Sequence, residues 1–328
     1  MPQRIDISQV QETFGSSSID LISAALGGQV LGFSDQFFAD AENLINPAPP
    51  VHKPGVFVPS GAWYDGWETR RHNKEPADWV VIKLGVASGT VLGVEIDTTY
   101  FNGNHAPAVS VEGTFIDGGH PDANTAWDEI LPKQETAYSH VRLNMYPDGG
   151  IARFRLYGNA VPVFPVDPES IIDLAHVSSG GLAVSCSDQH YGTKDNLLLP
   201  GRGKDMGDGW ETKRSREASH IDWVIVKLGA PGYIEEVVVD TLHFRGNYPQ
   251  AVEIYAIDAG SDHVVAASAP EWQKIVEAHP CEADKEHAFP STMLKDVSGN
   301  VVTHVKMVII PDGGVKRLRV YGKRAVSN

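Results

Sequence analysis

Cysteine is almost absent from this chain: only Cys186 and Cys281 occur among 328 residues, and no CxxC motif is present. Two cysteines are too few for the disulfide framework of a small secreted protein. The chain also lacks an apolar stretch near residues 1–15 that could serve as a secretion signal, and no run approaches the roughly 20 apolar residues of a membrane-spanning helix. We therefore expect a soluble, cytoplasmic protein with no membrane partner.

Basic residues are in the minority. The chain has 27 Lys and Arg against 42 Asp and Glu, which gives a formal net charge of −15. Because nucleic-acid binding requires a cationic surface, this balance argues against nucleic acid as a partner. A small anionic substrate remains compatible, since a few arginines can concentrate positive charge locally.

The sequence repeats itself. The segment "GWETRR" at 66–71 returns as "GWETKR" at 209–214, and "DWVVIKLG" at 78–85 returns as "DWVIVKLG" at 222–229. Further matched segments, in the same order in both halves, are 94–104 with 237–247 and 140–158 with 304–322. A preserved order of motifs indicates a tandem duplication.

We expect an N-terminal extension over residues 1–19, a first repeat over 20–158 and a second repeat over 171–328. The intervening segment, residues 159–170, has the sequence "NAVPVFPVDPES" and is rich in proline. Proline cannot pair along the interior of a sheet, so this segment is interpreted as a linker.

Short runs rich in Val and Ile fill each repeat, with Gly, Pro, Asn and Asp between them. This pattern predicts many short strands joined by turns, and hence an all-β fold of two jelly-roll sandwiches. Helical signals are sparse. We expect a short helical turn within "DQFFADAENLI" (35–45) and another within "APEWQKIVEAH" (269–279).

Three long segments carry a resemblance to a known family: "GAWYDGWETRRHNKEPADWVVIKLG" (61–85), "EIDTTYFNGNHAPAVSVEG" (95–113) and "LNMYPDGGIARFRLYG" (143–158). They closely resemble allantoicase, and the resemblance extends over nearly the whole chain. It implies two jelly-roll domains of the galactose-binding-like type and a homo-oligomer. It also implies hydrolysis of allantoate, a small-molecule substrate, to ureidoglycolate and urea.

Allantoate is a carboxylate whose central carbon carries two ureido groups, so an enzyme needs a cation for the carboxylate. Arg71 in "WETRR" is our candidate, although it could instead pair with Glu68 to hold the loop. An acid–base group must also protonate the leaving urea nitrogen and activate water. Glu68 is the candidate for this role; its recurrence as Glu211 suits a structural role equally well.

Polar residues that occur in only one repeat cannot be required by the shared fold. His105 becomes Tyr248 and His72 becomes Ser215. Because histidine titrates near neutral pH, His105 is a candidate catalytic residue and His72 a candidate for substrate binding. Asn104, beside His105 in an expected tight turn, is a further candidate for substrate binding.

Two shared residues are also candidates for substrate binding. Asp35, in the motif "SDQ", could accept ureido N–H groups, or could instead stabilise a turn or cap a helix. Trp67 could form an aromatic wall beside the ligand, although packing beneath its loop is the other interpretation.

No cofactor is firmly predicted, and a divalent metal is possible. Potential ligands gather in "AHPCEADKEH": His279, Cys281, Glu282, Asp284 and His287. Their types suit zinc or manganese, but their spacing matches no familiar pattern. The alternative function is a non-catalytic tandem module that binds carbohydrate or another small ligand, because fold alone does not determine function.

Overall fold

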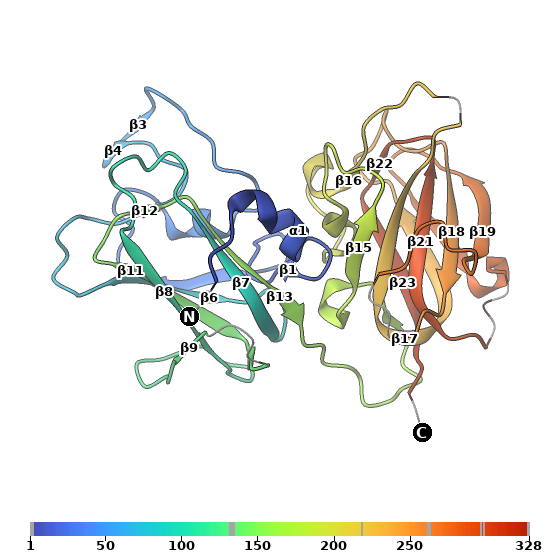
Figure 1. Ribbon diagram of the computed structural model, residues 1–328, viewed down its shortest axis with the longest axis horizontal. Helices are drawn as coiled ribbons and strands as arrows, with labels where there is room; N and C mark the ends of the chain where they lie inside the picture. The colour runs from blue at the N-terminus through green and yellow to red at the C-terminus, as the bar shows by residue number, and fades with distance from the viewer. Residues whose placement is uncertain are drawn as a thin grey trace. The chain divides into compact units, whose positions relative to one another are not determined.

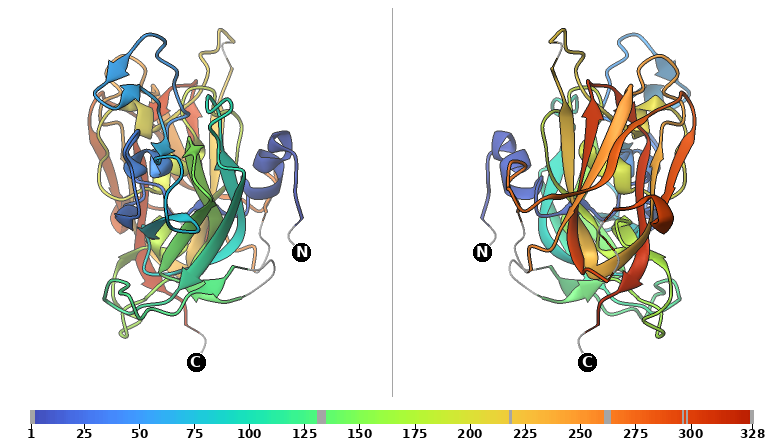
Figure 2. Two further views of the ribbon diagram at one scale, coloured as in Figure 1. Left: turned by 90° about the vertical axis from the view of Figure 1, so that its left-hand side faces the viewer. Right: turned by 90° about the vertical axis from the view of Figure 1, so that its right-hand side faces the viewer.

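The computed structural model describes residues 3–130, 135–217, 219–260, 264–295, 297 and 299–326. The chain divides into two compact units. The first contains Met1–Val10 and Ser18–Val161, and the second contains Gln11–Ser17 and Pro162–Asn328. Strands dominate both units and the helices are short (Figures 1 and 2). The predicted all-β class with tandem repeated domains is confirmed.

The elements of the first unit are η1 (Ile7–Gln9), β1 (Ile19–Asp20), β2 (Gln29–Phe33), η2 (Ala41–Ile45), β3 (Phe57–Val58), β4 (Gly61–Ala62), β5 (Trp67–Glu68), β6 (Asp78–Lys83), β7 (Gly89–Asp97), β8 (Ala108–Thr114), β9 (Asp128–Glu129), β10 (Ala137–Tyr138), β11 (His140–Tyr146), β12 (Gly150–Ile151) and β13 (Arg153–Ala160).

The elements of the second unit are α1 (Val10–Phe14), β14 (Ile172–Asp173), η3 (Val177–Ser179), β15 (Leu182–Cys186), η4 (Lys194–Leu198), η5 (Met206–Asp208), β16 (Trp210–Glu211), β17 (Asp222–Asp240), β18 (Ala251–Ile257), β19 (Gln273–Pro280), β20 (Glu286–Pro290), η6 (Ser291–Met293), β21 (Val302–Ile310), β22 (Gly314–Val315) and β23 (Arg317–Arg324).

Antiparallel strands form the sandwich of the first unit. One sheet has the order β1-β13-β7-β10 and the other has the order β2-β6-β11-β8-β9. Side chains alternate between the two faces of a strand, so β6 buries Val80 and Ile82 while Trp79 remains exposed. Leu143 of β11 and Phe154 of β13 are fully buried. The apolar alternation read from the sequence therefore forms the core of this unit.

The second unit repeats this arrangement with one difference. β17 is a single strand of 19 residues that corresponds to both β6 and β7. Its first half pairs with β15 and β21, and its second half pairs with β20 and β23. The register with β21 shifts between Lys227 and Gly232, where the strand passes from one set of partners to the other. β17 thus joins two sheets that are separate in the first unit (Figure 1).

One expected helix is wrong. The segment at 269–279 contributes to β19, which pairs with β18. Ile275 and Val276 are both buried there, and β-branched residues favour a half-buried pleated surface. Tertiary pairing therefore overrides the weak helical pattern. The other expected helical turn is found as the 3-10 helix η2, and no helix within the described residues is long and apolar enough to cross a membrane.

Candidate active site

Four loop segments meet at one end of the first unit. Glu68 of β5 pairs with Gly150 of β12 and forms an isolated bridge with Ala39. His105 forms a second isolated bridge with Gly150. These backbone contacts bring together residues 34–39, 67–73, 101–106 and 147–150. We call the polar side chains gathered there the Glu68 cluster, which comprises Asp35, Glu68, Arg70, Arg71, Asn104 and Asp148.

Glycine is required where the turn approaches its neighbours. A Cβ added to Gly150 would lie 2.0 Å from Cδ1 of Phe101, far inside van der Waals contact. Gly149 has φ +143°, a backbone conformation that residues other than glycine rarely adopt. The "PDGG" motif therefore lets the turn that carries Asp148 lie directly against the loop that carries Asn104.

Glu68 is a buried carboxyl group. It is 9% exposed, and its Oε1 accepts a hydrogen bond of 2.7 Å from Nδ2 of Asn104. Burial raises the pKa of Glu68 above its usual value, against the opposing effects of the Asn104 hydrogen bond and the positive charge of Arg71. A buried carboxyl group with a raised pKa is a candidate for proton transfer.

Arg71 pairs with Asp148 rather than with Glu68. Its Nη1 lies 2.9 Å from Oδ1 of Asp148, while Oδ2 of the same carboxylate accepts the backbone N–H of His72 at 2.8 Å. Asp148 is buried, whereas 42% of the Arg71 side chain is exposed. Asp148 thus fixes one side of the guanidinium and leaves part of it open to a ligand.

The carboxylate of Asp35 is hydrogen-bonded to Arg70. Its Oδ1 accepts from Nε and Nη2 of Arg70 at 3.0 and 2.7 Å, and its Oδ2 accepts the Arg70 backbone N–H at 2.7 Å. Burial raises the pKa of Asp35, but the hydrogen bonds from Arg70 outweigh it, so the pKa lies below its usual value. The carboxylate thus joins the segments 34–39 and 67–73, and its Oδ2 also accepts the backbone N–H of Phe37 at 3.5 Å, as in the turn-stabilising interpretation.

Trp67 lies beneath the loop. Its side chain is fully buried, and its Nε1 donates a hydrogen bond of 2.8 Å to the carbonyl oxygen of Asp35. A fully buried indole has no surface to present to a ligand, so its geometry matches the packing interpretation and not the aromatic wall. Trp67 positions Asp35, which in turn holds Arg70.

The two candidate histidines, His72 and His105, are both exposed. His72 has φ +62°, an uncommon conformation outside glycine, and contributes its backbone N–H to Asp148. His105 directly follows Asn104, which brings its backbone next to the partner of Glu68. The structure therefore gathers the candidate residues at one end of a single unit.

The second repeat retains only part of this arrangement. Asn247 donates to Oε1 of Glu211 at 2.6 Å, as Asn104 does to Glu68. Arg214, however, donates to the carbonyl oxygen of Gly246 at 2.8 Å, and the carboxylate equivalent to Asp148, Asp312, accepts the backbone N–H of Ser215. The ion pair that orients Arg71 is therefore replaced by a backbone contact at Arg214.

Sequence reasoning gave too little weight to Asp148 and did not single out Arg70. Asp148 lies in "YPDGG", a motif typical of a turn, and it recurs as Asp312 in the second repeat, so the sequence pattern is explained equally well by a turn. The available signal was the difference between "TRR" and "TKR", because a guanidinium can donate two N–H groups side by side, as Arg70 does to Oδ1 of Asp35, and a lysine ammonium lacks this planar fork.

The potential metal ligands at 279–287 contact other groups. Nε2 of His287 accepts the backbone N–H of Glu282 at 2.8 Å, and Asp284 accepts the backbone N–H of His243 at 2.7 Å. Within the described part of the chain, no group of three or more His, Cys, Asp or Glu side chains has an arrangement that could hold a metal ion.

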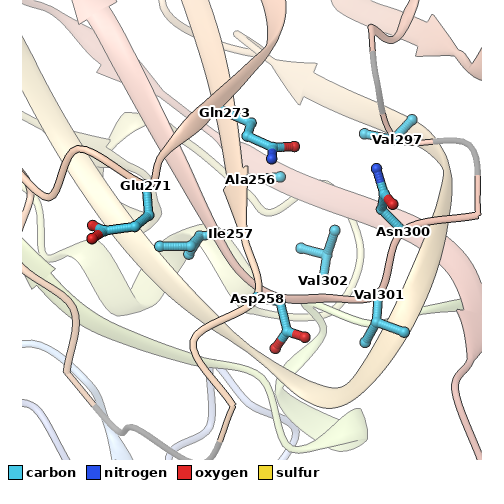
Figure 3. Close-up of a pocket in the computed structure, with 9 residues that line it drawn as sticks. All are labelled: Ala256, Ile257, Asp258, Glu271, Gln273, Val297, Asn300, Val301 and Val302. Carbon is cyan, nitrogen blue, oxygen red and sulfur yellow. The ribbon is translucent and has the colours of Figure 1, made fainter.

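A separate cavity of about 330 Å³ lies in the second unit, at the ends of β18, β19 and β21. Figure 3 shows the amide side chains of Gln273 and Asn300 and the side chain of Val302 among the residues that line it. It contains none of the candidate site residues and no basic side chain, so it does not suit a carboxylate.

Fold and site together define a protein of two tandem β-sandwich repeats, with a buried carboxyl group and arginine–carboxylate pairs at the end of the first. The family model of the allantoicase repeat matches residues 19–161 and again residues 172–325. The chain therefore belongs to the allantoicase family, which confirms the resemblance seen in the sequence.

Individual proteins similar to this chain also carry the name allantoicase. The chain is 60% identical to a probable allantoicase of Schizosaccharomyces pombe, with 99% of this chain and 98% of the relative covered. It is 58% identical to the allantoicase of Neurospora crassa, with 98% and 96% covered. The crystal structure of allantoicase from Saccharomyces cerevisiae superimposes with a TM-score of 0.84 at 44% identity, covering 97% of this chain and 98% of that one.

Proposed function

We propose that this protein hydrolyses allantoate to ureidoglycolate and urea. Membership of the allantoicase family over nearly the full chain supports the reaction. The observation that carries the choice of site is the buried Glu68 carboxyl group beside Arg71, whose guanidinium is held by Asp148 but remains partly exposed. Such a pair offers an acid–base group and a carboxylate-binding cation within one loop.

Arg71 binds the substrate carboxylate. Arginine presents several N–H donors in a planar fork that matches a carboxylate. Asp148 already engages Nη1, so the guanidinium orientation is set before the substrate arrives. Preorganisation of this kind places the central carbon of allantoate at a defined position relative to Glu68.

Glu68 transfers the proton. In the overall reaction the bond between the central carbon and one ureido nitrogen breaks, and a bond from that carbon to a water oxygen forms. The Glu68 carboxylate accepts the proton that water loses and returns it to the leaving nitrogen, so urea departs neutral. This sequence of proton transfers applies to direct displacement of the ureido nitrogen by water.

The remaining candidates act around this pair. Asn104 orients the Glu68 carboxylate, and its neighbour His105 is a second proton-transfer group on the exposed side. His72 contributes to substrate binding beside Arg71. Asp35 and Trp67 act indirectly, by holding the loop in place.

The first test is urea release from allantoate by the purified protein, with and without prior chelator treatment. We expect release that Glu68→Gln reduces strongly and Glu211→Gln does not. Loss on chelation with rescue by a divalent ion would add a metal to the site. A folded protein that releases no urea under either condition would reject the reaction and favour a non-catalytic binding module.

We further propose a cytoplasmic homo-oligomer. Both cysteines are free thiols, as is usual in a reducing compartment. Phe33, Trp79 and Tyr146, on strands of one sheet, each keep between 37% and 39% of their surface exposed, which suits a protein contact. Light scattering should give a multiple of the chain mass, and a single-chain mass would reject the oligomer.

A further inference from the structure

A second polar cavity lies within the second unit, and no residue of the Glu68 cluster lines it. It has a volume of about 310 Å³ and lies between β14, β17, β20 and β23. The lining residues that matter here are Asp173, His176, Val238, Glu286, Arg319 and Tyr321. Ligand sites are usually concave regions with a few converging polar groups, and a volume at the lower end of their range suits a small molecule.

The first repeat shows how this cavity can be closed. There Tyr157, the counterpart of Tyr321, donates a hydrogen bond of 2.7 Å to Oε2 of Glu95. Glu95 pairs with Arg155 across the strands, and the same register places Val238 opposite Arg319. A carboxylate therefore stands beside the tyrosine in the first repeat, and an apolar, shorter side chain replaces it in the second.

The second repeat also has an imidazole N–H donor, from His176, that the first repeat lacks at the equivalent position. His176 occupies the position of Ser23 in the first repeat. Its Nδ1 accepts the backbone N–H of Ser178 at 3.1 Å, so the neutral ring carries its proton on Nε2. Burial, together with the positive charges of Arg319 and Arg317, lowers the pKa of His176 to about 4. At neutral pH the imidazole is an uncharged N–H donor.

Two polar atoms of the lining lack hydrogen-bond partners. Nη1 of Arg319 and Oδ2 of Asp173 are both buried without one, and Nε of Arg319 lies 3.6 Å from that oxygen. A buried donor or acceptor without a partner is unfavourable, so a polar ligand that supplies one gains affinity. One of these atoms is a donor and the other an acceptor.

The charges around the cavity balance. Nε and Nη2 of Arg202 each lie 2.8 Å from a carboxylate oxygen of Asp240. The ionised groups of the lining are three arginines and three acids: Arg202, Arg317, Arg319, Asp173, Asp240 and Glu286. A balanced site gives no net attraction to an ion, so it favours a neutral ligand with both donors and acceptors.

We propose that this cavity binds a small neutral molecule that carries a urea group. The urea carbonyl accepts from Arg319 and from Nε2 of His176, and its N–H groups donate to Asp173. Urea is a product of the reaction proposed above, but the binding argument stands on the lining of the cavity alone.

The test measures binding of N-methylurea to the intact protein at pH 7 by saturation-transfer NMR, with acetate as a charged probe of similar size. Val238→Glu restores the residue of the first repeat and should place a carboxylate beside Tyr321, which fills the cavity. We expect N-methylurea to bind, acetate not to bind, and Val238→Glu to abolish binding. Glu68→Gln is the matched control and should leave binding unchanged.

His176→Ser provides a second variant if Val238→Glu does not fold. It also copies the first repeat and should weaken binding about tenfold, the effect of one hydrogen bond. Binding that persists in both folded variants, or that Glu68→Gln abolishes, would place the ligand elsewhere and overturn the proposal. Equal binding of acetate would overturn the neutral ligand class.

Discussion

The hydrogen bond from Asn104 to Glu68 offers a direct test of the proposed proton transfer. Asn104→Ala removes the donor that lies 2.7 Å from Oε1 of Glu68. A hydrogen bond to a carboxylate stabilises its charged form and lowers its pKa. Without Asn104, burial acts with less opposition, and the pKa of Glu68 should rise further above its usual value.

The magnitude follows from the burial of the group. A hydrogen bond to a charged group contributes about 1.5–3 kcal/mol, and one pKa unit corresponds to about 1.4 kcal/mol. Glu68 is only 9% exposed, so water replaces the lost donor poorly. We expect Asn104→Ala to destabilise the Glu68 carboxylate relative to its protonated form by about 1.5–3 kcal/mol, so that the pKa of Glu68 rises.

The assay is the pH dependence of kcat for urea release. Because the active form is the carboxylate, activity falls as the pH drops through the pKa of Glu68. The acid limb of the profile should therefore move upward in Asn104→Ala. Asn247→Ala is the matched control, since Asn247 donates to Glu211 at 2.6 Å in the second repeat. An unmoved acid limb in a folded Asn104→Ala protein, or an equal shift in Asn247→Ala, would refute the assignment.

Three further predictions test other parts of the molecule. Arg71→Ala should lower kcat/KM about 10- to 100-fold, the effect of losing a hydrogen bond between charged groups. Arg214→Ala should keep a kcat/KM near that of the wild type, and equal losses in the two variants would contradict the asymmetry between the repeats. Trp67→Phe should lower the free energy of unfolding by about 1–3 kcal/mol, because the carbonyl oxygen of Asp35 loses its buried indole donor. Guanidinium unfolding measures this loss, and an unchanged midpoint would contradict the prediction. The pKa of His176, lowered to about 4, makes its contribution to stability complete above the usual value of about 6.5 and lost as the pH falls toward 4. His176→Ser should therefore lose less stability between pH 7 and pH 5 than wild type, and parallel unfolding curves would exclude this contribution.

Secondary structure was predictable wherever the apolar pattern was regular. β6 and β11 coincide with short apolar runs rich in Val, Ile or Leu, the kind of segment that predicts strands. The segment at 269–279 was misread because Glu, Gln and Lys favour helices locally, whereas pairing with β18 decides its conformation. Local propensity is a weak guide when a neighbouring strand supplies a hydrogen-bond ladder.

The candidate site was predictable in part. The loop carrying Glu68 and Arg71 was identified from its duplicated motif, and Asn104 was identified beside a histidine unique to one repeat. The role of Asp148 was not, because a "PDGG" motif predicts a turn equally well with or without a functional carboxylate. Its contact with Arg71 crosses 77 positions in the sequence.

The sequence by itself determined the duplication, the all-β class and the family, because these depend on repeated motifs and on apolar periodicity, which are local properties. The tertiary structure alone decided which carboxylate meets which arginine. Asp35 holds Arg70 and Asp148 holds Arg71 because four loops close at one end of the first sandwich. The consequence of having Val238 in place of Glu95 is also visible only in the tertiary structure. The strand register pairs Glu95 with Arg155 in the first repeat and Val238 with Arg319 in the second. Contacts between distant segments depend on how the chain packs, and no local pattern encodes them.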